Sequence, residues 1–190
     1  MNPEEGRRLL EDTGAMRSGH FLLSSGRHSD RYVEKARVLE RPAAVMAFAE
    51  EIASWYPGID VVVSPAVGAI VLGFAVALHA GARFVFAERI EGAMMLRRGF
   101  GIHADERALV VEDVVTTGAS AREVHHLVAR AGASTLGVAA LVDRSEEPPQ
   151  FPLRAVVRVE AVSWLPEECP LCREGVPLEA PGSRHVVAGG

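Results

Sequence analysis

The chain has 190 residues, of which 48% are hydrophobic and 24% charged, a balance typical of a folded domain with a sizeable core. Its formal net charge of −5 argues against a nucleic acid or a membrane surface as the main partner. The start of the chain is charged where a signal peptide needs an apolar segment, and the longest apolar run, residues 66–78, is too short for a membrane span, so we expect a cytoplasmic protein.

The first part of the chain predicts a small N-terminal hood, residues 1–41, ahead of the main domain. Residues Pro3–Ala15 have helical character, and residues 19–35 indicate two short strands around a turn at Ser24–Ser29. An amphipathic helix follows and ends at Pro57–Gly58. Its apolar residues recur at helical spacing and are Val45, Phe48, Ile52 and Trp55.

Beyond residue 58, apolar segments with strand character alternate with helices. The strand segments are 60–65 (DVVVSP), 82–88 (ARFVFAE), 108–113 (ALVVED) and 135–143 (TLGVAALVD), and the helices are 66–81 and 119–132. Because these strands are largely apolar rather than alternating, they predict a parallel sheet covered on both faces. The fold class is therefore α/β, a doubly wound parallel sheet over residues 42–162 with an edge strand at Ala155–Val162. Residues 89–104 show no clear periodicity, and residues 163–190 form a tail.

Two adjacent acids, Glu112 and Asp113, end the third of these strands, and the hydroxyl-rich turn Thr116–Ser120 follows. In an open parallel sheet, ligands bind beyond the carboxyl ends of the strands. The turn offers hydroxyl groups, a close backbone approach at Gly118 and a helix N-terminus, all of which suit a phosphate. The acids would repel a phosphate but can accept hydrogen bonds from sugar hydroxyls, so the pattern indicates a phosphoribosyl group. The alternative is that Glu112 caps the strand and Asp113 supports the loop.

The stretch VVEDVVTTGAS, residues 110–120, resembles the phosphoribosyl-diphosphate-binding motif of the type I phosphoribosyltransferases. Three further stretches resemble the orotate-specific members of that family: GHFLLSSGRHSDRY in the hood, MLRRGF in a mobile loop and LVDR at a strand end. The resemblance spans about residues 9 to 145. It implies transfer of the phosphoribosyl group of 5-phospho-α-D-ribose 1-diphosphate to N1 of orotate, giving orotidine 5′-phosphate and diphosphate, in pyrimidine biosynthesis.

The resemblance also assigns binding residues. Phosphoribosyl diphosphate would contact the motif and the pyrophosphate loop: Glu112, Asp113, Val114, Val115, Thr116, Thr117, Gly118, Ala119, Ser120, Ala66, Val67 and Gly68. Orotate would contact Ser24, Tyr32, Val33, Thr116 and Arg144, within a base pocket shaped by Ser25, Gly26, Arg27, His28 and Ser29. A guanidinium can meet the orotate carboxylate with two parallel hydrogen bonds. The alternative for Arg144 is a surface arginine paired with Asp143 or Glu146.

The sequence departs from the family pattern in its cations. Gly68 and Ser24 stand where lysine is common, and the usual lysines and histidine of the mobile loop have no clear counterparts. Arg89, Arg97 and Arg98 are available instead, and we expect them to be catalytic together with Asp113. Because arginine does not give up a proton, they would stabilise the departing diphosphate by charge. The alternative is that Arg97 and Arg98 only solubilise the loop.

Metal binding is expected only through the substrate. The resemblance implies Mg²⁺ on diphosphate and ribose oxygens, with no protein side chain expected as a metal ligand. Cys169 and Cys172 form a CxxC pair, which is half of a common zinc site or a redox pair, and His185 is the only further candidate ligand nearby. With two ligands missing, we expect two free thiols. The other histidines that we expect to be bystanders are His20, His103, His125 and His126.

The resemblance implies a homodimer in which the loop of one subunit reaches the active site of the other. Two rival functions remain. One is an enzyme of the same superfamily that acts on a purine or on uracil, and such an enzyme would have no use for Arg144. The other is a regulatory protein that senses phosphoribosyl diphosphate and binds nucleic acid, although the acidic net charge and the lack of a helix-turn-helix segment count against it.

Overall fold

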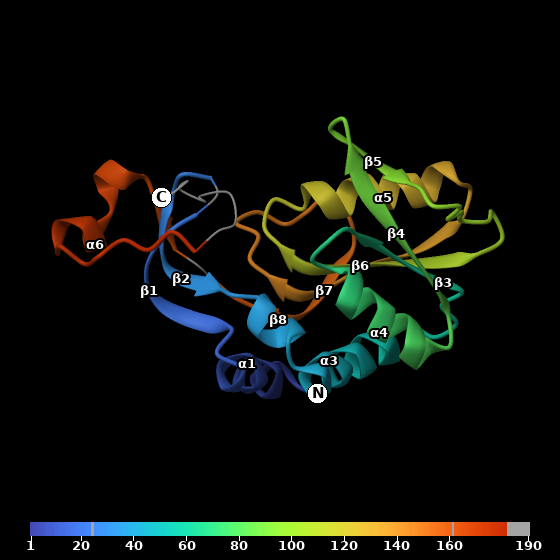
Figure 1. Ribbon diagram of the computed structural model, residues 1–190, viewed down its shortest axis with the longest axis horizontal. Coiled ribbons are helices and arrows are strands. Elements are labelled where there is room, and N and C mark those ends of the chain that lie inside the picture. Colours follow the sequence, from blue (N-terminus) through green and yellow to red (C-terminus); the bar gives the residue numbers. More distant parts are fainter. Residues whose placement is uncertain (24, 161, 182–190) are drawn as a thin grey trace.

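A six-stranded sheet forms the centre of the protein in the computed structural model, which describes residues 1–23, 25–160 and 162–181 (Figure 1). The strands are β3 (Val61–Pro65), β4 (Arg83–Ile90), β5 (Ala93–Leu96), β6 (Arg107–Val115), β7 (Ser134–Asp143) and β8 (Leu153–Arg158). Their order is β5-β4-β3-β6-β7-β8, and all neighbours are parallel except β4 and β5. The predicted doubly wound sheet is thus confirmed, although the edge strand β8 ends four residues before the predicted Val162.

Helices cover both faces of this sheet (Figure 1). Helix α5 (Ala119–Arg130) packs on one face through Ala121, Val124 and Val128, which are buried. The other face carries α1 (Pro3–Asp12), α3 (Pro42–Ser54) and α4 (Ile70–Ala80). Because β3 and β6 lie between these layers, their apolar segments are buried on both sides. None of the helices in the described ranges has the length and hydrophobicity that a membrane span requires.

Local sequence signals set the ends of the helices. Asn2 caps α1: its side-chain oxygen accepts a hydrogen bond from the Glu5 N–H at 2.9 Å, and the Glu5 carboxylate accepts one from the Asn2 N–H at 2.8 Å. Gly81, with a φ of 64°, ends α4 in the left-handed conformation that glycine adopts without strain. The helix predicted over residues 66–81 begins only at Ile70, because residues 66–69 form the turn that follows β3.

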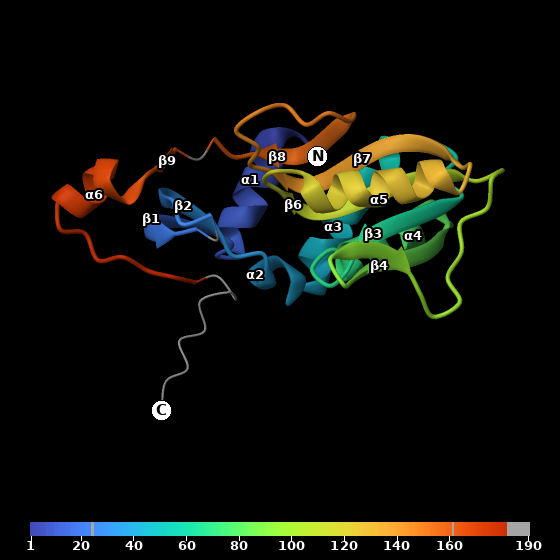
Figure 2. The same cartoon turned by 90° about the horizontal axis from the view of Figure 1, so that it is seen from above.

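The hood is a second, three-stranded sheet beside the main one (Figures 1 and 2). It consists of β1 (Met16–Leu22), β2 (His28–Val33) and β9 (Ser163–Trp164), so it combines strands from both ends of the chain. After β2 comes the short helix α2 (Ala36–Leu39), and after β9 come a 3₁₀ turn (Pro166–Glu168) and α6 (Pro170–Arg173). Helix α6 lies on the side of the hood away from the main sheet (Figure 2).

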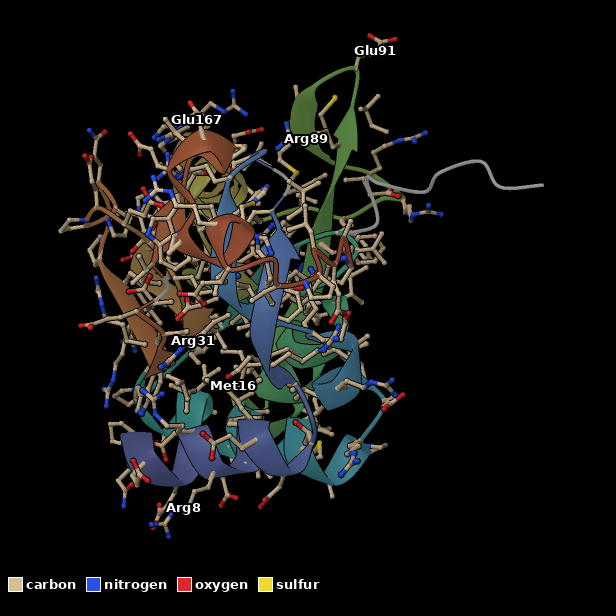
Figure 3. All side chains as sticks on the ribbon, turned by 90° about the vertical axis from the view of Figure 1, so that its left-hand side faces the viewer. Arg8, Met16, Arg31, Arg89, Glu91 and Glu167 are labelled. Atoms are coloured by element: carbon tan, nitrogen blue, oxygen red, sulfur yellow. The ribbon has the colours of Figure 1, made fainter. Side chains whose placement is uncertain are left out.

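Residues 89–104, where the sequence shows no periodicity, begin with a hairpin between β4 and β5. Ala87 pairs with Leu96 and Ile90 with Ala93, and the turn between them is Glu91–Gly92. Figure 3 places Glu91 at the tip of this hairpin. Strand β5 has only four residues, which is too short for alternation to indicate a strand from the sequence.

Candidate active site

The two acids of the motif lie inside β6, close to its carboxyl end at Val115. Both are buried: Glu112 is 8% exposed and Asp113 is 3% exposed. Glu112 Oε1 accepts a hydrogen bond from the Asp113 N–H at 3.0 Å, and Asp113 Oδ1 accepts one from the Val114 N–H at 2.6 Å. Both side chains are therefore held by the backbone of their own strand, at the edge of the sheet where ligands bind in folds of this class.

Burial and the neighbouring Asp113 carboxylate raise the pKa of Glu112 to about 8. The shift favours the protonated form of Glu112 in the folded protein. A protonated carboxyl can donate one hydrogen bond and accept others, which suits a sugar hydroxyl that also does both. The acid pair consequently carries less negative charge than two ionised carboxylates would, and this lowers its repulsion of a phosphate.

Lys35, for which the sequence pattern indicates no role, lies against the acid pair. Its Nζ is 2.5 Å from Asp113 Oδ2, and its side chain is 44% exposed. Lys35 is the only lysine of the chain, whose other basic residues are all arginine. That isolation was the one signal in the sequence that could have pointed to it.

The position of Lys35 also explains Gly68 in the loop that is predicted to bind pyrophosphate. A Cβ atom built at residue 68 would collide with the Asp113 carboxylate and with the Lys35 ammonium. The loop therefore passes so close to this ion pair that only glycine fits without a shift of its neighbours. Residue 68 itself carries no cation, but Lys35, from another segment of the chain, places one next to it. Ala66 and Val67, joined by a cis peptide, complete the loop, and Val67 is 80% exposed.

The turn that follows β6 forms the second part of the site. Thr116 and Thr117 are exposed, and Thr117 Oγ1 accepts a long hydrogen bond of 3.4 Å from the Ala119 N–H. Gly118, with a φ of 69°, opens α5, and a Cβ atom there would lie 3.0 Å from the Phe151 ring. Since the first N–H groups of a helix have no partner within the helix, this turn presents donors to an anion, and it does so directly after the acids.

Arg144 lies next to the same strand end. Its backbone N–H donates to the Val115 carbonyl at 2.8 Å, and its guanidinium donates to the Arg31 carbonyl at 3.4 Å. The side chain is half-buried, and its Nε has no hydrogen-bond partner among the described residues. Burial lowers the pKa of Arg144, and the nearby Tyr32 and Asp30 oppose this shift. A half-buried guanidinium with a free donor is suited to a carboxylate ligand.

The alternative for Arg144, a surface pair with Asp143 or Glu146, is wrong for the described residues. The Asp143 carboxylate accepts hydrogen bonds from Arg158 at 3.0 Å and from Ser145. Glu146 accepts a hydrogen bond from the Ser163 hydroxyl at 2.6 Å. Both acids are thus occupied by other partners.

The hood places its predicted residues in different surroundings. Tyr32 is half-buried against Phe21, with ring centroids 5.6 Å apart, and burial raises its pKa. Val33 is 6% exposed and belongs to the core. Arg27 donates to the hydroxyl and carbonyl of Ser163 at 2.8 and 2.7 Å, so it holds β9, and it also lines a pocket together with Arg144 and Ser163. Ser24 lies outside the described residues.

The three arginines that were expected to be catalytic have different surroundings in the structure. Arg89 forms a two-point ion pair with Glu123, at 2.9 and 3.1 Å, and Arg98 forms one with Glu88 at the same distances. Arg97 is exposed and has no ion pair within the described part of the chain. None of the three bonds to the acid pair in the described residues. Arg89 is labelled on the β4–β5 hairpin in Figure 3.

Comparison with known proteins identifies the family. Residues 36–163 match the family model described as Phosphoribosyl transferase domain. The chain belongs to this family. The phosphoribosyl-diphosphate motif, the pyrophosphate loop and Arg144 all lie within the matched residues, whereas β1, β2 and α6 lie outside them.

Several relatives cover all or nearly all of the chain. The orotate phosphoribosyltransferase of Chlorobaculum parvum is 47% identical over 193 residues, covering 100% of both chains. That of Thermoanaerobacter sp. is 46% identical and covers 97% of this chain and 99% of the relative. A solved structure of orotate phosphoribosyltransferase from Aeropyrum pernix has a TM-score of 0.67 at 23% identity, covering 80% of this chain and 93% of the other. The two chains thus share a fold at low sequence identity.

Proposed function

We propose that the protein is an orotate phosphoribosyltransferase, which transfers the phosphoribosyl group of phosphoribosyl diphosphate to N1 of orotate. The observation that carries this proposal is the position of Arg144. Its backbone is hydrogen-bonded to Val115 at the end of β6, the strand that carries the acids, so a guanidinium suited to a carboxylate starts from the same edge of the sheet as the sugar-phosphate site. Orotate carries a carboxylate, whereas purines and uracil do not. The full-length relatives with this name support the same substrate.

The residues of the site divide the work between the two substrates. The turn Thr116–Ser120 holds the 5′-phosphate through backbone N–H and hydroxyl groups. Glu112 and Asp113 hold the ribose hydroxyls, and Arg144 orients orotate so that N1 faces the anomeric carbon. As the bond to diphosphate breaks, the ribose carbon gains positive charge and the leaving group gains negative charge. Fixed groups that oppose these developing charges accelerate the transfer.

We propose Mg²⁺ as the cofactor. The diphosphate and ribose of the substrate bring hard oxygen ligands of the kind that Mg²⁺ prefers, so no protein side chain is needed as a ligand. When bound, Mg²⁺ neutralises part of the charge of the diphosphate. In the described residues, the acid pair does not form an all-protein metal cage, because it offers only two carboxylates and one of them is paired with Lys35.

Lys35 serves as the cation of the diphosphate site in place of the lysine that is absent at Gly68. It is part-exposed, adjoins the pyrophosphate loop and is held by Asp113 in a fixed position. We expect Lys35→Ala to raise the KM for phosphoribosyl diphosphate at least about tenfold, since hydrogen bonds to charged groups contribute roughly 1.5–3 kcal/mol. Lys35→Arg should restore part of the loss. Arg8→Ala, an exposed arginine on α1, is the matched control.

A homodimer is proposed from an exposed apolar stripe on α4. Val71 is 46% exposed, Phe74 58% and Leu78 61%, and their spacing places them on one side of the helix. Covering this stripe with a second copy would remove it from water. Sedimentation should show a dimer, and Phe74→Glu should shift it toward monomer. The Phe74→Glu variant should also lose transferase activity if the partner's loop, which carries Arg97, completes each active site.

The direct test is the loss of orotate absorbance when protein, phosphoribosyl diphosphate and Mg²⁺ are mixed, with adenine, guanine, xanthine and uracil assayed in parallel. We expect turnover of orotate alone. Arg144→Ala should raise the KM for orotate about 10- to 100-fold, because two charge-assisted hydrogen bonds are lost. Full activity of this variant would favour an enzyme for another base. No turnover, combined with salt-sensitive binding to nucleic acid, would favour a regulatory protein. The cytoplasmic location stays a prediction.

A further inference from the structure

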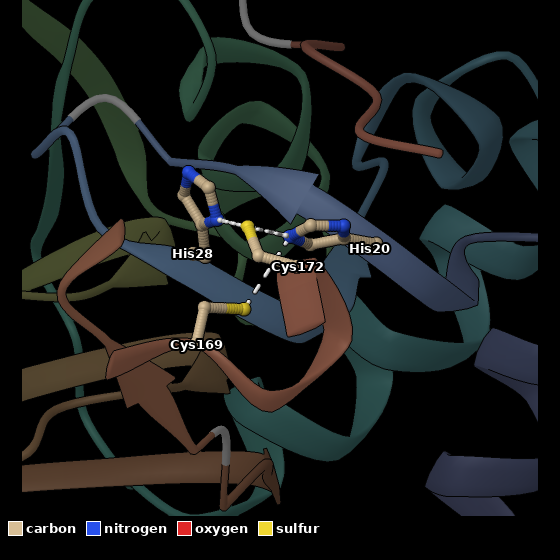
Figure 4. Close-up of side chains that lie close together, drawn as sticks. All are labelled: His20, His28, Cys169 and Cys172. Atoms are coloured by element: carbon tan, nitrogen blue, oxygen red, sulfur yellow. Dashed lines mark hydrogen bonds between the residues drawn. The ribbon is translucent and has the colours of Figure 1, made fainter. Parts of the chain in front are cut away.

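Four side chains from opposite ends of the chain converge on the outer side of the hood (Figure 4). His20 lies in β1 and His28 begins β2, while Cys169 and Cys172 lie at the start of α6 and within it. One nitrogen or sulfur atom of each residue lies within 4.8 Å of those of the other three. The histidines and Cys169 are buried, and Cys172 is exposed.

We propose that these four residues form a structural zinc site. A tetrahedral Zn²⁺ with bonds of about 2.0 Å to nitrogen and 2.3 Å to sulfur requires ligand atoms roughly 3.3–3.8 Å apart. His20 Nε2 is 3.5 Å from Cys169 Sγ and 3.7 Å from Cys172 Sγ. Cys172 Sγ is 3.3 Å from His28 Nδ1, and the two histidine nitrogens are 2.9 Å apart. Three of the six separations thus match the edges of a zinc tetrahedron, and the separation between the histidine nitrogens is shorter than such an edge.

The other ring nitrogen of His20 supports this assignment. His20 Nδ1 lies 2.8 Å from the Val176 carbonyl oxygen, which can only accept a hydrogen bond. Nδ1 therefore carries a proton, and Nε2, the nitrogen that faces the sulfurs, keeps its lone pair when the ring is neutral. Histidine ligands of zinc are commonly held in this way by a backbone carbonyl.

The site also accounts for how the segment after β9 is fixed to the hood. Among residues 162–181, Cys169 is the only buried residue, so this segment has no apolar core of its own. Apart from β9 and the cluster, it contacts the hood chiefly through Glu179, whose backbone N–H donates to the His20 carbonyl at 2.8 Å and whose carbonyl accepts from Leu22 at 2.7 Å. A segment with so little buried apolar surface needs a further constraint, and a metal ion provides one.

Four protein ligands leave no open position for substrate, so the role is structural rather than catalytic. On binding, each cysteine thiol releases its proton to solvent and coordinates as a thiolate, and no electron is transferred. From the sequence, the CxxC pair was expected to lack partner ligands. The proposed site adds two: His20, which was expected to be a bystander, and His28, which was expected in the base pocket. His185, the further candidate ligand expected from the sequence, lies outside the described residues.

The test uses the full chain, purified with reductant and without chelator, and its readout is metal content rather than transferase activity. Elemental analysis should give about one zinc per chain. Chelator treatment should remove it and lower the unfolding temperature, and added Zn²⁺ should restore both. Co²⁺ added to the metal-free protein should give the intense visible bands of tetrahedral thiolate coordination.

Variants separate coordination from folding. Cys172→Ser alters an exposed residue and should fold, yet bind zinc at least about tenfold more weakly, as should His28→Gln. His126→Ala, an exposed histidine on α5, is the control and should keep the full zinc content. The proposal is overturned if the reduced protein neither contains zinc nor takes it up. It is also overturned if Cys172→Ser binds zinc as the wild type does, or if the purified pair is a disulfide that binds no metal after reduction.

Discussion

Glu112 should make the folded protein less stable as the pH rises through the neutral range. Its pKa in the fold is raised to about 8 by burial and by Asp113, against an ordinary value of 4.5. A carboxyl with a raised pKa holds its proton more tightly in the folded chain than in the unfolded chain. The stability that this protonation contributes is largest below pH 4.5 and is lost progressively up to about pH 8. Most acidic residues act in the opposite direction.

The size of the effect follows from the two pKa values. Linkage gives a loss of roughly 2–3 kcal/mol in the free energy of unfolding between about pH 5.5 and 7.5 from this group. Glu112→Gln keeps the shape of the protonated side chain but cannot ionise. The free energy of unfolding of both proteins would be measured in urea at the two pH values and at one protein concentration. Between the lower and the higher pH, the variant should gain stability relative to the wild type by about that amount. Parallel pH dependence of the two proteins would refute a raised pKa at Glu112.

The remaining predictions concern the loop, the core and a helix cap. Gly68→Ala should cut kcat/KM for phosphoribosyl diphosphate, because its Cβ displaces the Lys35–Asp113 pair, while the far-ultraviolet circular dichroism stays unchanged; normal kinetics would contradict the close approach. Phe48→Ala removes a fully buried ring and should cost roughly 3–5 kcal/mol in denaturant unfolding, with a much smaller loss arguing against its place in the core. Asn2→Ala should cost about 1 kcal/mol by breaking the capping box, and thermal unfolding indistinguishable from wild type would show that the cap does not hold α1.

The sheet could be predicted because its signal is local. Apolar segments such as 108–111 and 138–142 can only be buried between two layers, and the segments between them have helical spacing. The motif acids and turn were found in the same way, since they are adjacent in sequence and lie at a strand end. The hairpin strand β5 was missed because four residues give too little alternation to detect.

The rest depends on contacts between distant segments, which no local pattern encodes. Lys35 reaches Asp113 across 78 positions of the chain, and the sequence shows only that it is a lone lysine. The Cys169–Cys172 pair was visible, but its histidine partners lie more than 140 positions away, in the hood. Their proximity follows from the closing of the tail onto β2 through β9, a pairing of two residues that carries almost no sequence signal.

The single lysine gives this protein a built-in chemical reporter. An amine-reactive acylating reagent can modify only Lys35 and the α-amino group, so intact-mass analysis would count site occupancy without a tag or an engineered cysteine. Because the Lys35 ammonium is ion-paired with Asp113, its acylation should be slow, and occupancy of the diphosphate site should slow it further. Ligand affinity could then be measured from protection rates alone, even for analogues that never turn over.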